Sequence, residues 1–271
     1  MATKLLLVGC GKMGGALLDG WLKQGVISSN ITVIEPNNDT ATALRTQYKV
    51  ATKASPDDFD LDKKPNVIIF AVKPQIMDVV APSYARFAET EVVYLSIAAG
   101  KTISYYENVL GRNASIVRAM PNTPAAVSRG ITVYCTNTQA NSEQISLCEH
   151  LLSSIGEVAR TENEGHIDIV TALSGGGPAY VFLLAECLSK AGIKAGLPEE
   201  LSKLIARVTV AGSGELLHRS GKDPAILRQD VTSPGGTTAE ALRILMADNG
   251  WQPLLDEAIA AATLKSRELA K

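Results

Sequence analysis

A glycine-rich turn directly after a short apolar run is the feature that most constrains how this chain can fold. Residues 4–8 read Lys-Leu-Leu-Leu-Val, and Gly9-Cys10-Gly11-Lys12-Met13-Gly14 follows at once. A nearly continuous apolar run is typical of a strand buried on both faces of a parallel sheet. Helical character follows over residues 15–23. This order predicts a βαβ unit whose glycines allow a tight turn, close approach of a ligand and close helix packing.

The later runs extend this pattern into a domain. Strand-like runs alternate with helical patterns, which favours a doubly wound parallel α/β sheet of the Rossmann type. The strand-like runs are residues 31–34, 67–70, 92–95, 115–118, 131–134 and 156–159, and one intervening helix is predicted over 39–48. After about residue 162 the strand patterns stop, and helices are predicted over 168–190, 198–219, 238–247 and 252–270. We therefore expect a dinucleotide-binding domain over residues 1–162 and an all-helical domain over residues 163–271.

Composition and charge narrow the classes of function. The chain has 271 residues, of which 46% are hydrophobic, so it is long and apolar enough to form one large hydrophobic core or two smaller ones. Its net charge of −2 argues against a nucleic-acid partner. The four cysteines are far apart and the three histidines lack metal-ligand spacing, so no disulfide framework and no metal site are predicted. No signal peptide is recognised, and the longest uncharged run, 169–185, is shorter than a membrane span requires. We expect a cytoplasmic protein with no membrane partner.

The glycine turn and its context predict a site for a dinucleotide. Glu35 closes the second strand, where an acid usually bonds the ribose 2′-hydroxyl of NAD and repels the 2′-phosphate of NADP. The turns after the other strands lie at the sheet edge where ligands bind in such folds. The alternatives are glycines that serve packing alone, a solvated Glu35 or Lys73, and an Asn122 that only forms a turn. The candidate cofactor-binding residues are Val8, Gly9, Cys10, Gly11, Lys12, Met13, Gly14, Glu35, Asn37, Ala71, Val72, Lys73, Pro74, Ile97, Ala98, Ala99 and Asn122.

A second glycine-rich segment lies in the helical half. Residues 231–240 read Val-Thr-Ser-Pro-Gly-Gly-Thr-Thr-Ala-Glu and run into a predicted helix. The first N–H groups of a helix lack intrahelical partners, so this helix start is suited to a small anion such as a carboxylate. The alternative is a helix cap, with Thr237 or Thr238 as the N-cap residue. A bound nicotinamide would carry the chemistry, and a threonine hydroxyl could reach the heteroatom of a hydride acceptor.

Taken together, these segments resemble the pyrroline-5-carboxylate reductases. Residues 173–180, Leu-Ser-Gly-Gly-Gly-Pro-Ala-Tyr, and 233–238, Ser-Pro-Gly-Gly-Thr-Thr, are the most specific, and segments 8–14, 71–74, 96–100 and 118–124 precede them in family order. The resemblance implies reduction of Δ1-pyrroline-5-carboxylate to L-proline, the last step of proline biosynthesis, by NADPH or NADH. It implies that Thr238 is the catalytic residue, with its hydroxyl on the ring nitrogen. The implied substrate-binding residues are Ser233, Gly235, Gly236, Thr237 and Thr238.

The resemblance also implies self-assembly. Helical domains of this family intertwine as homodimers, dimers often form decamers, and the active site lies between one subunit's cofactor domain and the partner's helices. That arrangement would explain the uncharged run 169–185, which one small helical domain could hardly bury alone. Two residues depart from the family pattern. Glu35 stands where many members carry a small or hydroxyl residue suited to NADP, and Asp230 stands where some relatives have a neutral residue.

Two other functions fit parts of the pattern. A 3-hydroxyacid dehydrogenase needs a catalytic lysine soon after its glycine-rich helix segment, but the first lysine after Gly177 is Lys190. A non-catalytic dinucleotide sensor would share the fold, although residues 233–238 are typical of a ligand loop. A protonated imine accepts hydride far better than a neutral one, and no strong acid lies near this loop in sequence. We therefore expect water or pre-protonated substrate to supply the proton.

Overall fold

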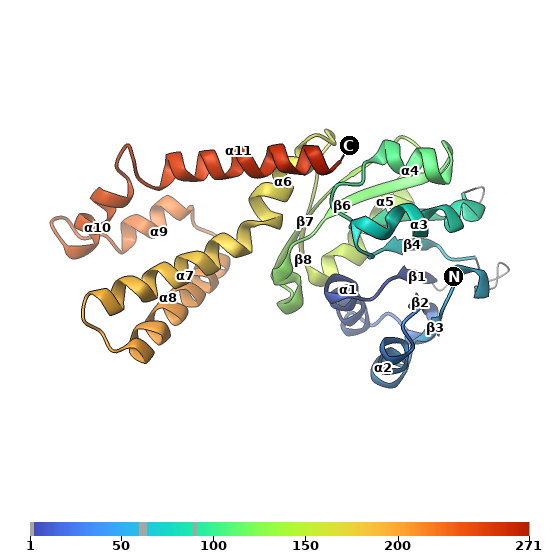
Figure 1. The fold of residues 1–271 in the computed structure, drawn as a ribbon, viewed down its shortest axis with the longest axis horizontal. Helices are drawn as coiled ribbons and strands as arrows, with labels where there is room; N and C mark the ends of the chain where they lie inside the picture. Colours follow the sequence, from blue (N-terminus) through green and yellow to red (C-terminus); the bar gives the residue numbers. More distant parts are fainter. Residues whose placement is uncertain (1–2, 60–63, 89–90, 271) are drawn as a thin grey trace. The chain divides into compact units, whose positions relative to one another are not determined.

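The computed structural model describes residues 3–59, 64–88 and 91–270, and its first part is built on one twisted sheet (Figure 1). Within the described residues this sheet has eight strands in the order β3-β2-β1-β4-β5-β6-β7-β8. The strands are β1 (Leu5–Val8), β2 (Ile31–Ile34), β3 (Ala51–Lys53), β4 (Val67–Phe70), β5 (Val93–Ser96), β6 (Ser115–Met120), β7 (Gly130–Thr136) and β8 (Gly156–Arg160). The predicted doubly wound α/β fold is therefore confirmed.

The point where the strand order reverses lies between β1 and β4. Strand β1 pairs in parallel with β2 on one side and with β4 on the other, so that Leu5 is opposite both Ile31 and Val67. Chain direction is the same in all three strands, so the turns that leave β1 and β4 lie next to each other at the carboxyl edge. Ligands bind at this position in open α/β sheets.

Two features of the sheet differ from the sequence-based prediction. Strand β3 was not predicted, because Ala51-Thr52-Lys53 is an exposed edge strand with no apolar run. Strand β7 is antiparallel to β6, so the sheet is parallel only in its other pairings. The connection from β6 to β7 is short and contains a 3₁₀ helix over Thr123–Val127. A parallel crossover needs a dozen or more residues, so this connection can only return the chain in the opposite direction.

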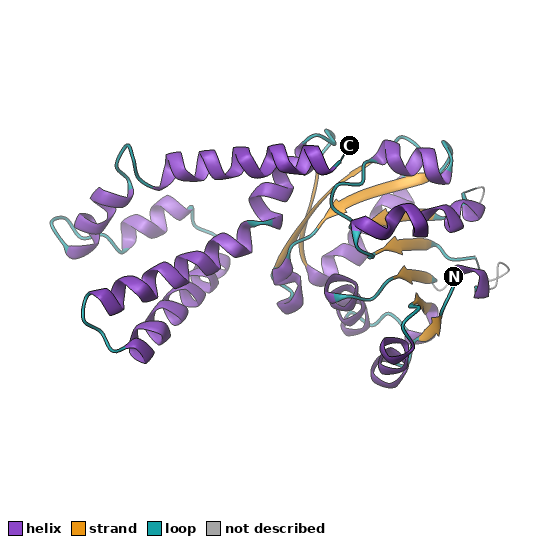
Figure 2. Ribbon diagram, in the orientation of Figure 1, coloured by secondary structure: helices purple, strands orange, loops and turns teal. Residues whose placement is uncertain are grey.

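Helices cover both faces of the sheet (Figure 2). Strand residues alternate between the faces, and the core accordingly forms two clusters, with Leu5 and Leu7 in one and Leu6 and Val8 in the other. The first face carries α1 (Lys12–Lys23), α2 (Asn38–Tyr48) and α5 (Ser142–Leu152), and the second carries α3 (Met77–Val80), α4 (Ile103–Leu110) and α6 (His166–Val170). Both faces are therefore apolar, which explains why the strand sequences lack alternating polar residues.

In the described residues after β8, the regular elements are all helices. They are α7 (Gly177–Lys194), α8 (Glu199–Ser220), α9 (Pro224–Asp230), α10 (Thr237–Leu245) and α11 (Trp251–Leu269). The helix predicted over 168–190 is in fact α6, a π-helix over Thr171–Gly175 and α7, and α9 was not predicted. The chain divides into two compact units, residues 1–175 with 263–271 and residues 176–262. The boundary between the two units lies after residue 175, whereas the sequence predicted a domain boundary after residue 162. Helix α11 begins in the second unit and ends in the first.

The helical unit exposes a large amount of apolar surface. Helices α7 and α8 pack on each other, yet none of the residues of α7 is buried in this chain. Phe182 is 65% exposed and Leu254 is 61% exposed. In the described part of the chain, one helical stretch, 166–194, is long and apolar enough to cross a membrane by length and composition. Exposed apolar patches of this kind mark surfaces that contact another protein or a membrane.

Candidate functional site

Gly9 and Gly14 fix the turn at the carboxyl end of β1. Gly9 has φ +83°, and a Cβ on it would lie 2.6 Å from Cγ1 of Val72 in the neighbouring turn after β4. Its N–H donates to the carbonyl of Ile34 at 3.0 Å, which ties the turn to the end of β2. A Cβ on Gly14 would lie 2.6 Å from the carbonyl oxygen of Gly9. Both glycines are therefore required by the packing of the turn itself.

Gly11 differs from these two glycines because the fold does not require it. A Cβ on Gly11 would have no described heavy atom within 4 Å, and its φ of −73° suits any residue. Gly11 is the N-cap residue of α1, and among the described side chains none caps this helix. The first turn of α1 also lacks an acidic residue. The free N–H groups and the helix dipole thus face open space, which is suited to a phosphate.

The other predicted residues of this turn contribute through their backbone or as packing. Val8 is buried in the core, and its carbonyl accepts the N–H of Ala71 at 2.9 Å. Met13 packs against the core, and Lys12 is exposed. Cys10 is half-buried, and its burial, together with the nearby charge of Glu35, raises the pKa of its thiol to about 11. Cys10 is therefore a neutral thiol at physiological pH.

Glu35 lies just after β2 with its carboxylate held in place. The backbone N–H of Asn37 donates to Oε1 of Glu35 at 3.0 Å, and the N–H of Glu35 donates to the carbonyl of Lys53 at 2.9 Å. The side chain of Asn37 accepts the N–H of Thr40 at 2.9 Å and so caps α2. Asn37 is thus a helix cap that also orients the carboxylate. Glu35 is half-buried and stands where a ribose-binding acid is expected.

The turns after β4, β5 and β6 lie at the same edge of the sheet. Lys73 is exposed at the start of a 3₁₀ helix over Pro74–Ile76. Ala98 is only 4% exposed, and its methyl group belongs to the core on the second face of the sheet. The side-chain oxygen of Asn122 accepts the N–H of Ile131 at 3.0 Å, so this oxygen holds the start of β7. The predicted cofactor residues are therefore on neighbouring loops, but not all of them present a free side chain.

The predicted substrate loop belongs to the helical unit and leads directly into α10. Gly235 has φ +70°, and the N–H of Gly236 donates to the carbonyl of Ser233 at 3.0 Å. The N-cap residue of α10 is Gly236, and among the described side chains none caps this helix. The alternative that Thr237 or Thr238 is the N-cap residue is therefore wrong. Thr237 and Thr238 are instead the first two helical residues, with their N–H groups at the helix start.

The charge of Asp230 is balanced. Nζ of Lys222 lies 2.8 Å from Oδ2 of Asp230, which places a cation beside this carboxylate at the end of α9. The hydroxyl of Thr232 donates to the carbonyl of Arg228 at 2.6 Å and so serves the end of the same helix. The paired Asp230 presents less uncompensated negative charge to a carboxylate ligand than an isolated one would. The unpredicted helix α9 brings these groups together.

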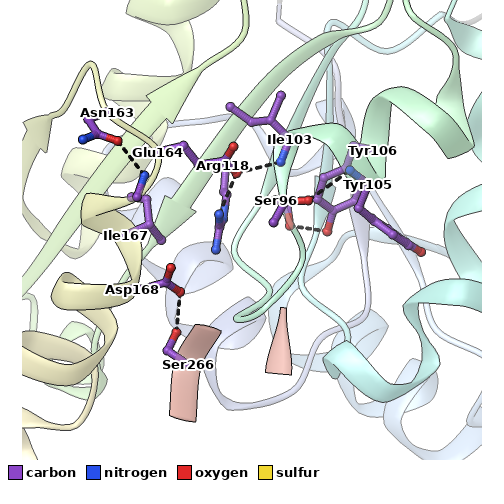
Figure 3. Close-up of polar contacts among 12 residues, drawn as sticks. Ser96, Ile103, Tyr105, Tyr106, Arg118, Asn163, Glu164, Ile167, Asp168 and Ser266 are labelled. Atoms are coloured by element: carbon purple, nitrogen blue, oxygen red, sulfur yellow. Dashed lines mark hydrogen bonds and ion pairs between the residues drawn. The ribbon is translucent and has the colours of Figure 1, made fainter. Parts of the chain in front are cut away.

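Sequence reasoning missed a buried polar cluster below the turn after β5 (Figure 3). Arg118 in β6 is 3% exposed, and its Nη1 lies 2.6 Å from Oε1 of Glu164. The same oxygen accepts the N–H of Ile103 at 2.7 Å. An arginine in the apolar run Ser-Ile-Val-Arg-Ala-Met was the available signal. Its partner Glu164 could not be found from spacing, because it is distant in sequence.

Comparison with known proteins assigns both halves of the chain to one family. Residues 164–269 match the family model described as pyrroline-5-carboxylate reductase dimerisation, and residues 4–100 match that of NADP oxidoreductase, coenzyme F420-dependent. The pyrroline-5-carboxylate reductase of Synechocystis sp. is 35% identical over 272 residues, which cover 100% of both chains. This chain belongs to the pyrroline-5-carboxylate reductase family. The enzyme of that name from Escherichia coli K12 is 34% identical, also over 100% of both chains.

Solved structures of pyrroline-5-carboxylate reductases have the same fold. The structure from Coxiella burnetii is similar with a TM-score of 0.94 and 32% identity, and the match covers 100% of both chains. The Plasmodium falciparum structure, solved with NADP bound, has a TM-score of 0.82 and 32% identity over 99% of this chain and 98% of that one. The family resemblance seen in the sequence is therefore confirmed.

The contrast between Gly11 and Gly14 gives a matched test of the turn. Gly11→Ala should change the free energy of unfolding by less than ~1 kcal/mol, because the fold leaves room for the methyl group. It should still weaken NAD(P)H binding strongly, since the methyl group occupies the space that a pyrophosphate needs. Gly14→Ala should instead destabilise the protein by about 1–3 kcal/mol through overpacking. Thermal melts and cofactor titrations measure both effects, and unchanged NAD(P)H affinity in Gly11→Ala would contradict this role.

Glu35 is expected to set the choice between NADH and NADPH. A carboxylate facing the 2′-phosphate costs about 1–4 kcal/mol of Coulomb energy at close range, depending on the local dielectric. NADH should therefore be used at least as well as expected for an NADPH-preferring relative. Glu35→Ser should move the ratio of kcat/KM values toward NADPH. Steady-state rates with both cofactors measure this ratio, and no movement would mean that Glu35 does not face the ribose.

Proposed function

We propose that this chain catalyses the NAD(P)H-dependent reduction of Δ1-pyrroline-5-carboxylate to L-proline, the final step of proline biosynthesis. The observation that carries the proposal is a pair of helix starts without a side-chain cap in a chain that matches relatives over 100% of their length. One follows Gly11 in the α/β unit, and the other follows Gly236 in the helical unit. The first is suited to the pyrophosphate of a dinucleotide and the second to a carboxylate.

The cofactor site fits an extended dinucleotide. The N–H groups at the start of α1 would hold the pyrophosphate, with the space beside Gly11 left for its approach. Glu35 would receive a ribose hydroxyl. The backbone of residues 97–99 and Asn122, on loops further along the same edge, would border the nicotinamide. The bound NAD(P)H supplies the hydride, and these residues orient its donor carbon.

The substrate site uses the start of α10. The N–H groups of Gly236, Thr237 and Thr238, together with Ser233 and Gly235, would hold the carboxylate of the substrate. The half-buried hydroxyl of Thr238 would bond the ring nitrogen and orient the imine carbon. With Asp230 paired to Lys222, no described acid of this loop is free to act as a strong proton donor. Water or pre-protonated substrate therefore supplies the proton, and Thr238 relays it.

The helical domain, residues 163–271, is the part that dimerises. Its support is the dimerisation family model over 164–269 and the exposed apolar side chains of α7, α8 and α11. In this proposal the partner's helices complete the active site, and dimers assemble further into a decamer. In this proposal the partner rather than lipid covers the apolar stretch 166–194. The enzyme is proposed to be cytoplasmic, as its relatives' role in biosynthesis favours.

Thr238→Ala tests the function and the catalytic residue together. Wild-type enzyme should oxidise NAD(P)H when pyrroline-5-carboxylate is added, and a lack of this activity would contradict the reductase. The variant keeps the backbone N–H groups but loses a hydrogen bond that strengthens as charge moves on the nitrogen, so kcat should fall roughly ten- to a thousandfold.

Thr232→Ala is the matched control for this experiment. Its hydroxyl belongs to the same loop but is bonded to the carbonyl of Arg228, so kcat should stay near the wild-type value. Thr238→Ala should also leave the melting temperature almost unchanged, because Thr238 does not cap α10. A wild-type kcat in Thr238→Ala would remove Thr238 from the mechanism.

The proposed assembly predicts the mass of the protein in solution. Light scattering at micromolar concentration should give the mass of a dimer or of a multiple of it, because a large apolar surface of the obligate kind stays buried on dilution. Phe182→Glu places a charge on the exposed face of α7 and should shift the enzyme toward monomer with loss of activity. Ile27→Glu, on an exposed side chain of the α/β unit, is the control. A fully active monomeric wild type would contradict the proposed assembly.

A further inference from the structure

We propose that the ion pair between the buried Arg118 and the half-buried Glu164 is a positioning device that holds the wall of the nicotinamide site. The wall is the segment from Ile97 to Ile103, which leaves β5 and enters α4. The inference rests on the proposed function, because that function assigns the nicotinamide to this segment. Neither residue would touch the cofactor, and both act through the segment's backbone.

The far end of the segment is fixed by Glu164. Its Oε1 lies 2.6 Å from Nη1 of Arg118 and also accepts the N–H of Ile103 at 2.7 Å (Figure 3). Ile103 is the first residue of α4, whose N-cap residue Thr102 accepts the N–H of Tyr105 at 3.1 Å. The carboxylate thus satisfies an N–H at the helix start that has no partner within the helix.

The near end of the segment is fixed by Ser96. Its Oγ accepts the N–H of Ala98 at 3.2 Å and lies 2.6 Å from the hydroxyl of Tyr106. Burial raises the pKa of Tyr106, so this phenol stays neutral at physiological pH and can donate to Ser96. Ser96 is the register partner of Arg118 in the neighbouring strand. The near end is therefore tied to β5 and α4, and the far end is tied to Glu164, which pairs with Arg118 on β6.

The positive charge of Arg118 holds the carboxylate of Glu164 in place. Arginine stays protonated in proteins, so Arg118 brings a permanent charge into a site where it is 3% exposed. Its Nε is buried without a hydrogen-bond partner among the described groups. Glu164, whose side chain is 30% exposed, is the acid paired with it in the described structure, and its removal would leave the buried guanidinium without this partner, which is destabilising. Since the pair fixes Glu164, it also fixes the backbone of Ile103.

The chain on either side of Glu164 reinforces this arrangement. Glu164 lies two residues before α6, where Oδ1 of Asp168 accepts the hydroxyl of Ser266 at 2.7 Å. Ser266 belongs to the last turns of α11, and the carbonyl oxygen of Leu269 lies 3.2 Å from the place of a Cβ on Gly100. Gly100, with φ +75°, is in the middle of the segment. The segment is thus restrained at both ends and along its middle.

A pair of double variants separates positioning from general stability. Arg118→Met with Glu164→Gln removes both charges but keeps an oxygen for the N–H of Ile103. Arg118→Met with Glu164→Leu removes the charges and the acceptor. Neither leaves an unpaired buried charge, and well-packed apolar replacements of buried pairs often preserve stability. The two proteins therefore differ chiefly in the contact to Ile103, and thermal melts check that both are folded.

The leucine double variant should lose about ten- to a hundredfold in kcat/KM for NAD(P)H, as expected from a misplaced reacting group. The glutamine double variant should recover most of this loss. Asp57→Asn removes an exposed ion pair with Arg86 in the same unit and should leave the rates unchanged. Equal rates in the two double variants would overturn the inference.

Binding without the substrate distinguishes this inference from the proposed function. The leucine double variant should bind NADPH more weakly than the glutamine double variant. The two should bind ADP-ribose, which lacks nicotinamide, equally well. If the wild type binds NADPH but does not reduce pyrroline-5-carboxylate, the proposed function is contradicted. The comparison of the two double variants still tests the positioning role of the ion pair. Equal NADPH affinities in the two double variants, or a parallel loss of ADP-ribose binding, would overturn it.

Discussion

The contact between the turns after β1 and β4 is the constraint on which the nucleotide-binding half depends. Gly9 meets Val72 without room for a side chain, and Gly14 meets the carbonyl of Gly9 in the same way. These contacts allow the turns after two neighbouring strands to approach closely at the carboxyl edge and α1 to pack against them. The start of α1 then points its free N–H groups at open space beside Gly11. The position of the candidate site therefore follows from packing, before any ligand is considered.

Much of this fold is predictable because its signals are local. Buried strands such as Val67–Phe70 are short continuous apolar runs, and the glycine turn follows its strand directly. The antiparallel direction of β7 depends on the length of one connection. The edge strand β3 is held by its pairing with β2 and has almost no apolar signature. The edge strand depends on a neighbour in space, so reading the chain along its length does not detect it.

The candidate site likewise has features with a local sequence signal and features that depend on contacts between distant residues. The helix start at residues 236–237 was recognised from glycine and threonine, but only the backbone geometry shows that Gly236, not a threonine, is the N-cap residue. The pairing of Asp230 with Lys222 needed the unpredicted helix α9. Glu164 and Arg118 meet across the fold, and neither sequence spacing nor composition relates them. The roles of the individual cofactor and substrate residues stay predictions until they are measured.

The path of α11 has a consequence for how the two units are connected. This helix starts at Trp251 in the helical unit, and its residues from Thr263 onward belong to the α/β unit. Residues 176–262 are therefore topologically an insertion, joined to the rest of the chain by two covalent links rather than one. A cut at either link alone would therefore leave the two units still joined through the other link.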